Sequence, residues 1–311
     1  MKKNLTLLTL LVVISMVVIY FYIPTTDNIL FQRNVSCTES GASRQIINKA
    51  KWPLWWPGKK ITDNEYSYQS YQYHINKILM NGVEATIFYN AKDSLKAYFQ
   101  ITYNAPDTTQ FQWTAKYNFS TNPIKRLQQY FELNKIKNNV EDLLADTKKH
   151  FDKPENIYGI KVMKETVKEA FYISTKQTFS TYPTTPEIYK MIQSLREYIA
   201  NNRDEAKGDP MLHVEQEGSS VFVTLVAIPT KNNLPSNGDF KPKRMILGNI
   251  LTAEVKGGNH TIINGEKELA NYVVDYKKLS PAIPFQSLAT NRLQEADTSK
   301  WITKLYYPIF Q

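Results

Sequence analysis

Cysteine is almost absent from this chain of 311 residues, in which only Cys37 occurs. A single thiol excludes an intramolecular disulfide and a zinc cluster built on cysteines. The 4 histidines are scattered through the chain without the spacing of metal ligands. We therefore expect no metal ion and no other cofactor.

The chain also lacks a block of basic residues, although 38 basic and 29 acidic side chains give it a net charge of +9. Nucleic-acid binding needs clustered positive charge, so we expect no nucleic-acid partner. The local patterns G-x-S-x-G and H-E-x-x-H, which mark common hydrolases, do not occur either. No catalytic residue is therefore assigned from a motif.

One long run lacks charge altogether. Residues 4–24, NLTLLTLLVVISMVVIYFYIP, are uncharged, and their length is close to the roughly 20 residues of a membrane helix. Lys2 and Lys3 precede the run, so the positive-inside bias places the chain after it outside the cytoplasm. The run ends in bulky aromatic residues without a small-x-small cleavage site, which argues against a cleaved signal peptide. We expect a single-pass transmembrane anchor over residues 1–24, a linker over 25–35, and extracytoplasmic domains after it.

Aromatic residues are plentiful, at 13% of the chain, and three tryptophans gather in KWPLWWPG at residues 51–58. The two prolines of this stretch prevent a continuous helix and predict a rigid apolar turn. The turn either plugs a cavity or forms a lip at a membrane interface, where tryptophan is enriched. In the following run, NEYSYQSYQYHINKI, the alternation changes face near Gln69, which predicts a β-bulge.

A long helix is predicted to start at Asn122-Pro123, with asparagine as its cap, and to end near His150. Its apolar residues change from one face to another near Glu132, so its first turns should pack on something different from the rest. A short helix, several antiparallel strands and this long helix predict an α+β domain over residues 36–154.

The second half contains an internal repeat. Residues 160–180 predict a strand, 186–202 an amphipathic helix, and 208–216 with 219–229 a pair of strands. After a linker the order recurs as strand 244–258, helix 265–279, and strands 283–291 and 300–310. Pro210 and Pro284 occupy equivalent places in the two copies. The fold class expected here is α+β, a pseudo-twofold duplicated strand–helix–strand–strand domain with a ligand groove between its copies.

Residues 157–311 resemble the GyrI-like domain, also called the bacterial transcription-activator effector-binding domain. The resemblance rests on the glycine-ended strand before the second helix, on PFQSL at 284–288, and on the closing LYYPI at 305–309. Residues 36–154 are similar to the SRPBCC (START-like, polyketide cyclase) helix-grip fold in their tryptophan-rich turn and in the order of their elements.

The resemblance implies a cleft lined by aromatic residues from both halves. In the GyrI-like family a glutamate commonly follows the PF of the second half and balances the charge of cationic, apolar ligands; Gln286 stands at this position here. An amide can donate and accept hydrogen bonds but carries no charge. Gln286 is therefore expected to be a pocket residue for a neutral or weakly polar ligand, and a hydrogen-bonded sheet residue is the alternative.

Four further residues are candidates for ligand binding. The resemblance favours Tyr306 as a ligand-binding residue, and a core tyrosine is the alternative. Trp301 is predicted to lie on the opposite face of the same strand. His213 lies near the pseudo-symmetric counterpart of Gln286, and Tyr172 belongs to the first strand of the repeat. For His213 an exposed strand histidine is the alternative.

These expectations together predict a membrane-anchored protein that binds or senses a small apolar molecule without catalysis. A hydrolase of small electrophilic compounds, as some GyrI-like relatives are, is the first alternative. It would need an acid or base in the cleft, for which Glu165, Glu215, Tyr172 and Tyr306 are available. A module that docks another protein is the second alternative.

Overall fold

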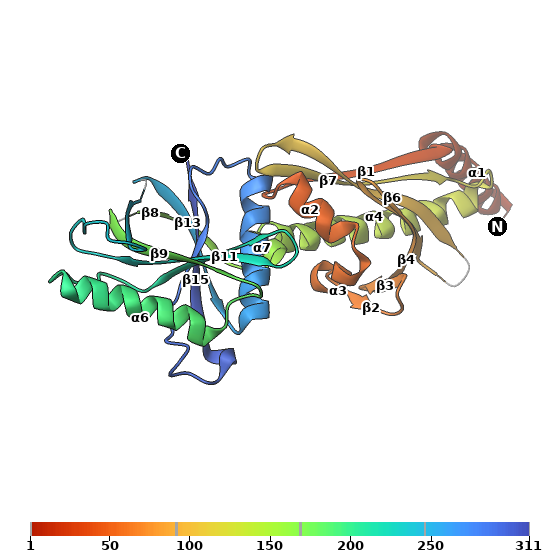
Figure 1. Ribbon diagram of the computed structural model, residues 1–311. Coiled ribbons are helices and arrows are strands. Elements are labelled where there is room, and N and C mark those ends of the chain that lie inside the picture. Colours follow the sequence, from red (N-terminus) through yellow and green to blue (C-terminus); the bar gives the residue numbers. More distant parts are fainter. Residues whose placement is uncertain (1, 91–92, 168–169, 246, 311) are drawn as a thin grey trace. The chain divides into compact units, whose positions relative to one another are not determined.

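Two α+β units make up the chain in the computed structural model, which describes residues 2–90, 93–167, 170–245 and 247–310. Unit 1 is Met1–Lys153 and unit 2 is Pro154–Gln311. Each unit is built on one antiparallel sheet that curls around its own core (Figure 1).

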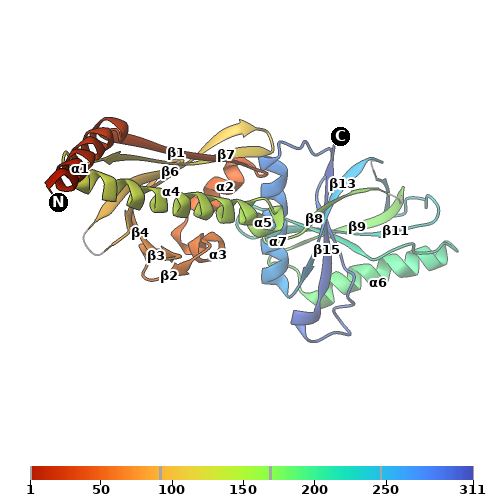
Figure 2. The same cartoon turned by 180° about the vertical axis from the view of Figure 1, so that it is seen from behind.

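Unit 1 has a seven-stranded sheet in the order β1-β7-β6-β5-β4-β3-β2, with the long helix α4 along one face. The sheet lies in front of α4 in one view and behind it in the opposite view (Figures 1 and 2). The strands are β1 (Thr26–Val35), β2 (Lys59–Lys60), β3 (Glu65–Tyr68), β4 (Tyr71–Leu79), β5 (Gly82–Phe88), β6 (Ser94–Ala105) and β7 (Thr108–Asn118). The helices are α1 (Lys2–Tyr22), α2 (Glu39–Ile46), η1 (Lys49–Lys51), α3 (Trp52–Trp55) and α4 (Pro123–Phe151).

Helix α4 starts where the Asn-Pro pair predicts, because the Asn122 side chain accepts hydrogen bonds from the backbone N–H groups of Ile124 and Lys125. The second half of the helix packs its apolar stripe on the sheet, from Leu133 onward. In the first half, by contrast, Ile124 and Phe131 are exposed, and the buried residue is Arg126. The change of face near Glu132 thus separates two halves of the helix that have different neighbours.

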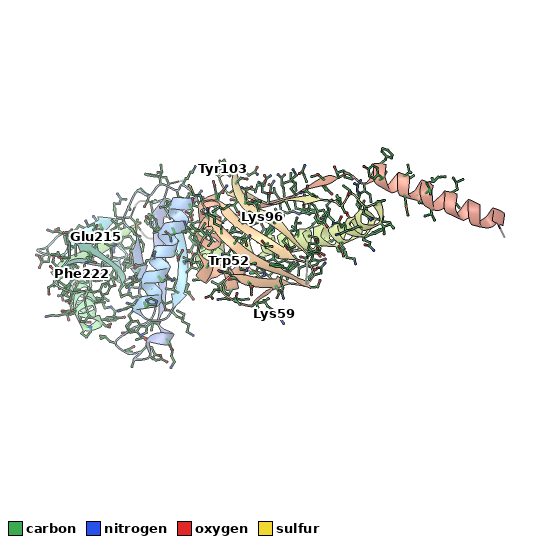
Figure 3. All side chains as sticks on the ribbon, turned by 90° about the vertical axis from the view of Figure 1, so that its right-hand side faces the viewer. Trp52, Lys59, Lys96, Tyr103, Glu215 and Phe222 are labelled. Carbon is green, nitrogen blue, oxygen red and sulfur yellow. The ribbon has the colours of Figure 1, made fainter. Side chains whose placement is uncertain are left out.

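The tryptophans of α3 and the residue after it fill the interior of unit 1. Trp52, Trp55 and Trp56 are buried, and their rings contact each other and the rings of Tyr66 and Tyr73. Trp52 belongs to this interior, whereas Lys59 lies exposed at the edge of the unit (Figure 3). The cavity left between the sheet and α4 measures only about 10 Å³, which is at the lower limit for a single water molecule. The three tryptophans of the turn are thus part of the packed core of unit 1.

A tight turn replaces the bulge predicted near Gln69. Strands β3 and β4 form a hairpin in which Tyr68 pairs with Tyr71, and Gln69 has a positive φ of 50°. A two-residue turn resets the alternation of side chains just as a bulge does, so the sequence pattern does not distinguish them.

The transmembrane helix predicted over residues 1–24 is wrong. Among the described residues, no helix combines the length with the apolar character that a membrane crossing requires. The membrane partner and the single-pass, extracytoplasmic localisation rested on that helix and are corrected with it.

An arginine of helix α4 contacts the end of the charge-free run. Arg126, only 1% exposed, donates from Nη1 to the carbonyl oxygens of Tyr20, at 3.0 Å, and Ile23, at 3.3 Å. Its guanidinium also lies 4.8 Å from the centre of the Tyr20 ring. The hydropathy of residues 4–24 does not indicate this contact, because the arginine lies outside them, in α4.

Unit 2 contains the repeat, arranged in an eight-stranded sheet of order β12-β9-β11-β10-β14-β15-β13-β8. In each copy the first strand pairs with the last (β9 with β11, β13 with β15), and the second strands of the two copies, β10 and β14, pair with each other at the centre. The strands are β8 (Val162–Thr166), β9 (Phe171–Phe179), β10 (Met211–Glu217), β11 (Val221–Pro229), β12 (Lys241–Arg244), β13 (Asn249–Lys256), β14 (Phe285–Ser287) and β15 (Ile302–Ile309). The helices are α5 (Pro154–Tyr158), α6 (Thr185–Asn201), α7 (Asn259–Asp275) and η2 (Thr298–Lys300).

Helices α6 and α7 pack on one face of this sheet. Helix α6 covers β9 and β11, and Ile173, Val226 and Leu212 of β10 join its buried side chains in one apolar core. Helix α7 approaches β13 and β15 closely at Gly265, where an added Cβ would lie 2.9 Å from Leu305. Because side chains alternate along a strand, the residues next to these in sequence face the opposite side of the sheet. We call the two sides the helix face and the open face.

Candidate functional site

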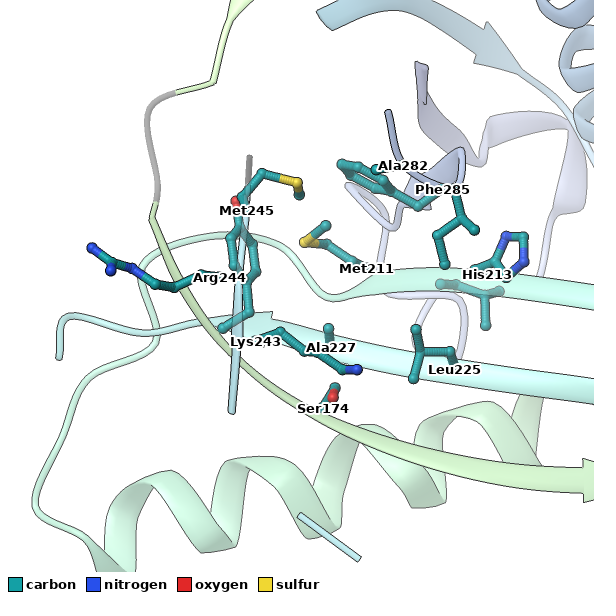
Figure 4. Close-up of a pocket in the computed structure, with 13 residues that line it drawn as sticks. Ser174, Met211, His213, Leu225, Ala227, Lys243, Arg244, Met245, Ala282 and Phe285 are labelled. Atoms are coloured by element: carbon teal, nitrogen blue, oxygen red, sulfur yellow. The ribbon is translucent and has the colours of Figure 1, made fainter. Parts of the chain in front are cut away.

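An apolar groove lies on the open face of the unit 2 sheet. One lobe, of about 250 Å³, is bounded by residues of β9, β10, β11 and β12 and by the segment before β14 (Figure 4). A second lobe, of about 350 Å³, continues over β14 and β15 towards β8. Tyr172, Met211, Met245 and Phe285 line both lobes, so the two lobes adjoin at these side chains.

Aromatic and sulfur-containing side chains form the walls of the groove. Phe285 and Tyr306 stand opposite each other on β14 and β15, with their rings stacked at 5.0 Å and 12° between planes. Met211 and Met245 add flexible, polarisable walls that adapt to irregular ligands. A concave site of this composition is typical of the pockets that bind small molecules.

The polar groups of the groove are distributed unevenly between its lobes. His213 and Lys243 line the first lobe, and none of the described residues that line it is acidic. Glu165, Asp209 and Lys304 line the second lobe. Burial is the main cause that raises the pKa of Tyr306, and the negative charges of Glu165 and Asp209 add to it. The Glu165 carboxylate accepts a hydrogen bond of 3.0 Å from the Thr252 hydroxyl.

The structure divides the five residues expected to bind a ligand between the two faces of the sheet. Tyr172, His213 and Tyr306 line the groove on the open face. Gln286 pairs with Leu212 and Leu305, which face the helices, and is itself 2% exposed. Trp301, which precedes β15, is 7% exposed and is not among the groove-lining residues.

Gln286 belongs instead to a buried polar cluster under the helices. Its Nε2 donates to Glu266 Oε1 of α7 at 3.1 Å, and its Oε1 accepts from Arg292 Nη2 at 3.4 Å. Arg292 also donates to Thr303 Oγ1 at 2.9 Å and lies 4.9 Å from the centre of the Trp301 ring. The amide thus links a carboxylate to a guanidinium, because it can donate to one and accept from the other.

Burial sets the ionisation of this cluster. It raises the pKa of the Glu266 carboxyl, while the hydrogen bond from Gln286 and the charge of Arg292 oppose the rise less strongly. It also lowers the pKa of the Arg292 guanidinium. Both shifts follow from the cost of holding a charge away from water.

We predict that Glu266 makes unit 2 less stable as the pH rises. Its folded-state pKa is raised above the ordinary value of 4.5, so its contribution is greatest below that pH and is lost as the pH rises through the folded pKa. Glu266→Gln should therefore remove this decline. Amide hydrogen exchange in α7 and β14, followed against pH, measures the effect, with the exposed Glu254→Gln as the control for losing one carboxylate. If the stability of unit 2 declines with pH equally in the wild type and in Glu266→Gln, other groups cause the decline.

Sequence reasoning missed Glu266 and Arg292. Helix α7 begins at Asn259, six residues before the predicted start at Gly265, so Glu266 lies inside the helix rather than at its first turn. The available signal was Gly265 itself, since a glycine within a helix often marks a close approach to a neighbour. Arg292 lies in the irregular segment between β14 and η2, for which periodicity makes no prediction.

The chain matches no known sequence family, and no curated protein matches it. Among solved structures, the C-terminal domain of EcmrR is 13% identical, with a TM-score of 0.42 over 49% of this chain and 98% of its own. A hydrolase from Listeria innocua is 11% identical, with a TM-score of 0.38 over 48% of this chain and 91% of its own. SAV2435, solved with tetraphenylphosphonium bound, is 10% identical, with a TM-score of 0.33 over 48% of this chain and 93% of its own.

These likenesses are consistent with the GyrI-like resemblance of residues 157–311. At such low identities and TM-scores they carry no argument about function, which is inferred below from the groove itself. The SRPBCC-like resemblance of residues 36–154 stays a prediction.

Proposed function

We propose that unit 2 binds a small, largely apolar molecule in the groove on the open face of its sheet. The observation that carries this proposal is the pair of adjoining lobes that share aromatic and methionine side chains as walls. Met211 and Phe285 are only half-buried, so a bound molecule would remove further apolar surface from water, at about 25 cal/mol for each Å². That gain is the driving force for binding.

Three of the five candidate residues have direct roles in this proposal, and a fourth has an indirect one. Tyr306 and Tyr172 offer ring faces for an apolar body and hydroxyl groups for a polar substituent. His213 borders the first lobe with its Nε2 buried and without a hydrogen bond in the described part of the chain. Gln286 acts indirectly, by holding β14 against α7 beneath the groove.

The proposed role is binding rather than hydrolysis or docking of a protein. Hydrolysis needs a base that a partner orients towards a nucleophile. Glu165 already accepts a hydrogen bond from Thr252, and the buried His213 Nε2 has no nucleophile within hydrogen-bond reach among the described residues. A docking surface for a protein is usually broad and shallow, and its standard size is about 800 Å² on each partner. The volumes of the two lobes, about 250 and 350 Å³, suit a small molecule better.

Filling the first lobe should weaken binding. N-phenyl-1-naphthylamine, a neutral dye that fluoresces in apolar surroundings, is expected to bind the full chain and to brighten. Ala227 lines the first lobe, so Ala227→Trp should weaken dye binding at least about tenfold, equal to about 1.4 kcal/mol. The matched control is Ala296→Trp, which adds the same indole at an exposed site away from the groove. Equal dye affinity in both variants would place the binding site elsewhere.

A further inference from the structure

Among its described residues, the first lobe of the groove is lined by basic side chains without acidic ones, and this distribution of charge affects which apolar molecules the groove binds. The inference rests on the function proposed above. Lys243 of β12 stands directly opposite Tyr172 of β9, and Lys176 of β9 stands directly opposite Leu225 of β11. Directly opposed residues of an antiparallel pair share a face. Tyr172 and Leu225 line the first lobe, so both lysines belong to the open face at its border.

Neither lysine is neutralised within the described part of the chain. No ion pair or side-chain hydrogen bond of Lys176 or Lys243 occurs among the described residues. In Figure 4 the amine end of Lys243 is turned toward Ala227 and Leu225, whereas the guanidinium of Arg244 points away from the groove. Arg244 lies instead over the Phe171 ring, 5.3 Å from its centre. Lys243, which lines the first lobe, and Lys176, on the same face at its border, are thus two cations near a molecule in that lobe.

The carboxylates on the open face lie elsewhere. Glu165 and Asp209 line the second lobe and are absent from the described lining of the first. Glu215, further along β10, lies 3.9 Å from His213 Nε2 and is positioned to balance that histidine if it is protonated. An anion in the first lobe would therefore meet ammonium groups without an acidic neighbour among the lining residues.

We propose that the groove selects apolar acids in their anionic form, with the carboxylate held by Lys243 and Lys176 and the hydrocarbon body over Tyr172, Met211 and Phe285. An ammonium group attracts a carboxylate most strongly where an apolar wall excludes part of the water. Because both lysines are exposed, the gain from charge is modest and screened by salt.

The test compares three ligands that share a ten-carbon chain: decanoate, 1-decanol and decylamine. Each is titrated against the full chain loaded with N-phenyl-1-naphthylamine, and the displacement of the dye is measured at low salt. Decanoate should bind about fivefold more tightly than decanol, in line with the strength of partly exposed ion pairs. Decylamine should bind more weakly than decanol.

Substitution of the lysines separates charge recognition from burial. In the Lys176→Gln/Lys243→Gln double variant, decanoate should lose its advantage and bind no more tightly than decanol does to the same variant. Lys267→Gln, at an exposed position of α7, is the control and should keep the preference for decanoate. The preference should also shrink as salt is raised.

The possible outcomes distinguish this inference from the proposed function. If decanol and decanoate bind equally to the wild type, or if decylamine binds best, the anion preference is overturned while ligand binding in the groove stands. If none of the three displaces the dye, or the dye does not bind, the proposed function fails and the preference fails with it.

Discussion

Replacing Gln286 with glutamate should destabilise unit 2 by about 3–5 kcal/mol at neutral pH, the usual cost of an uncompensated buried charge. In the wild type the Gln286 amide donates to Glu266 Oε1 at 3.1 Å. The substitution removes this donor and places a second carboxylate beside a carboxyl group whose pKa is already raised by burial. Arg292, which contacts the other end of the amide at 3.4 Å, would offset only part of the repulsion.

Two controls identify the cause of this loss. The destabilisation should shrink as the pH falls, because one of the two carboxyls then takes up a proton and donates it to the other. The double variant Gln286→Glu/Glu266→Gln exchanges the carboxylate and the amide, and should recover most of the lost stability. Amide hydrogen exchange in β14 and α7 of the full chain measures the stability of unit 2 in each variant. A Gln286→Glu variant as stable as the wild type would mean that the cluster is open to water.

Removing one tryptophan ring from the core of unit 1 should have an effect of similar size. Trp52 is 1% exposed and contacts the rings of Trp55, Trp56 and Tyr66. Trp52→Ala should cost about 3–5 kcal/mol, because a large cavity opens in a core that collapses only partly. It also leaves the Ile46 carbonyl oxygen without the hydrogen bond of 2.7 Å that it accepts from Trp52 Nε1.

The control for this substitution lies in the same short helix. Leu54 is 68% exposed, so Leu54→Ala should change the stability by no more than about 0.5 kcal/mol. Urea unfolding monitored by near-ultraviolet circular dichroism reports the aromatic packing of unit 1. Similar midpoints for the two variants would show that the tryptophans do not hold the core together.

The order of elements in unit 2 could be predicted because each depends on local patterns. Proline at 210 and at 284 precedes β10 and β14, and period-2 and period-3.6 runs mark the strands and the helices. The strand predicted over residues 160–180 is, however, two strands, β8 and β9, which lie near opposite ends of the sheet. Local patterns give an extended conformation but not the partner with which a strand pairs.

The side of the sheet that Gln286 faces could not be predicted in the same way. Alternation along residues 285–287 defines two faces, but it does not say which one the helices cover. That choice is made by packing: the counterpart of Gln286 across the centre of the sheet is Leu212, which belongs to the core under α6. The same limit applies to Tyr306 and Trp301. Alternation predicts that they lie on opposite faces, but not which of those faces the helices cover.

The most direct test of binding in the groove uses the methyl resonances of the methionines as position markers. Met211 and Met245 line both lobes, whereas Met191 is 2% exposed in the core beneath α6. The full chain, labelled with ¹³C at its methionine methyl groups, is titrated with N-phenyl-1-naphthylamine and followed by nuclear magnetic resonance. Binding in the groove predicts saturable shifts of the Met211 and Met245 signals with Met191 nearly unchanged. Saturable shifts confined to other methionines, or no saturable shift at all, would contradict it.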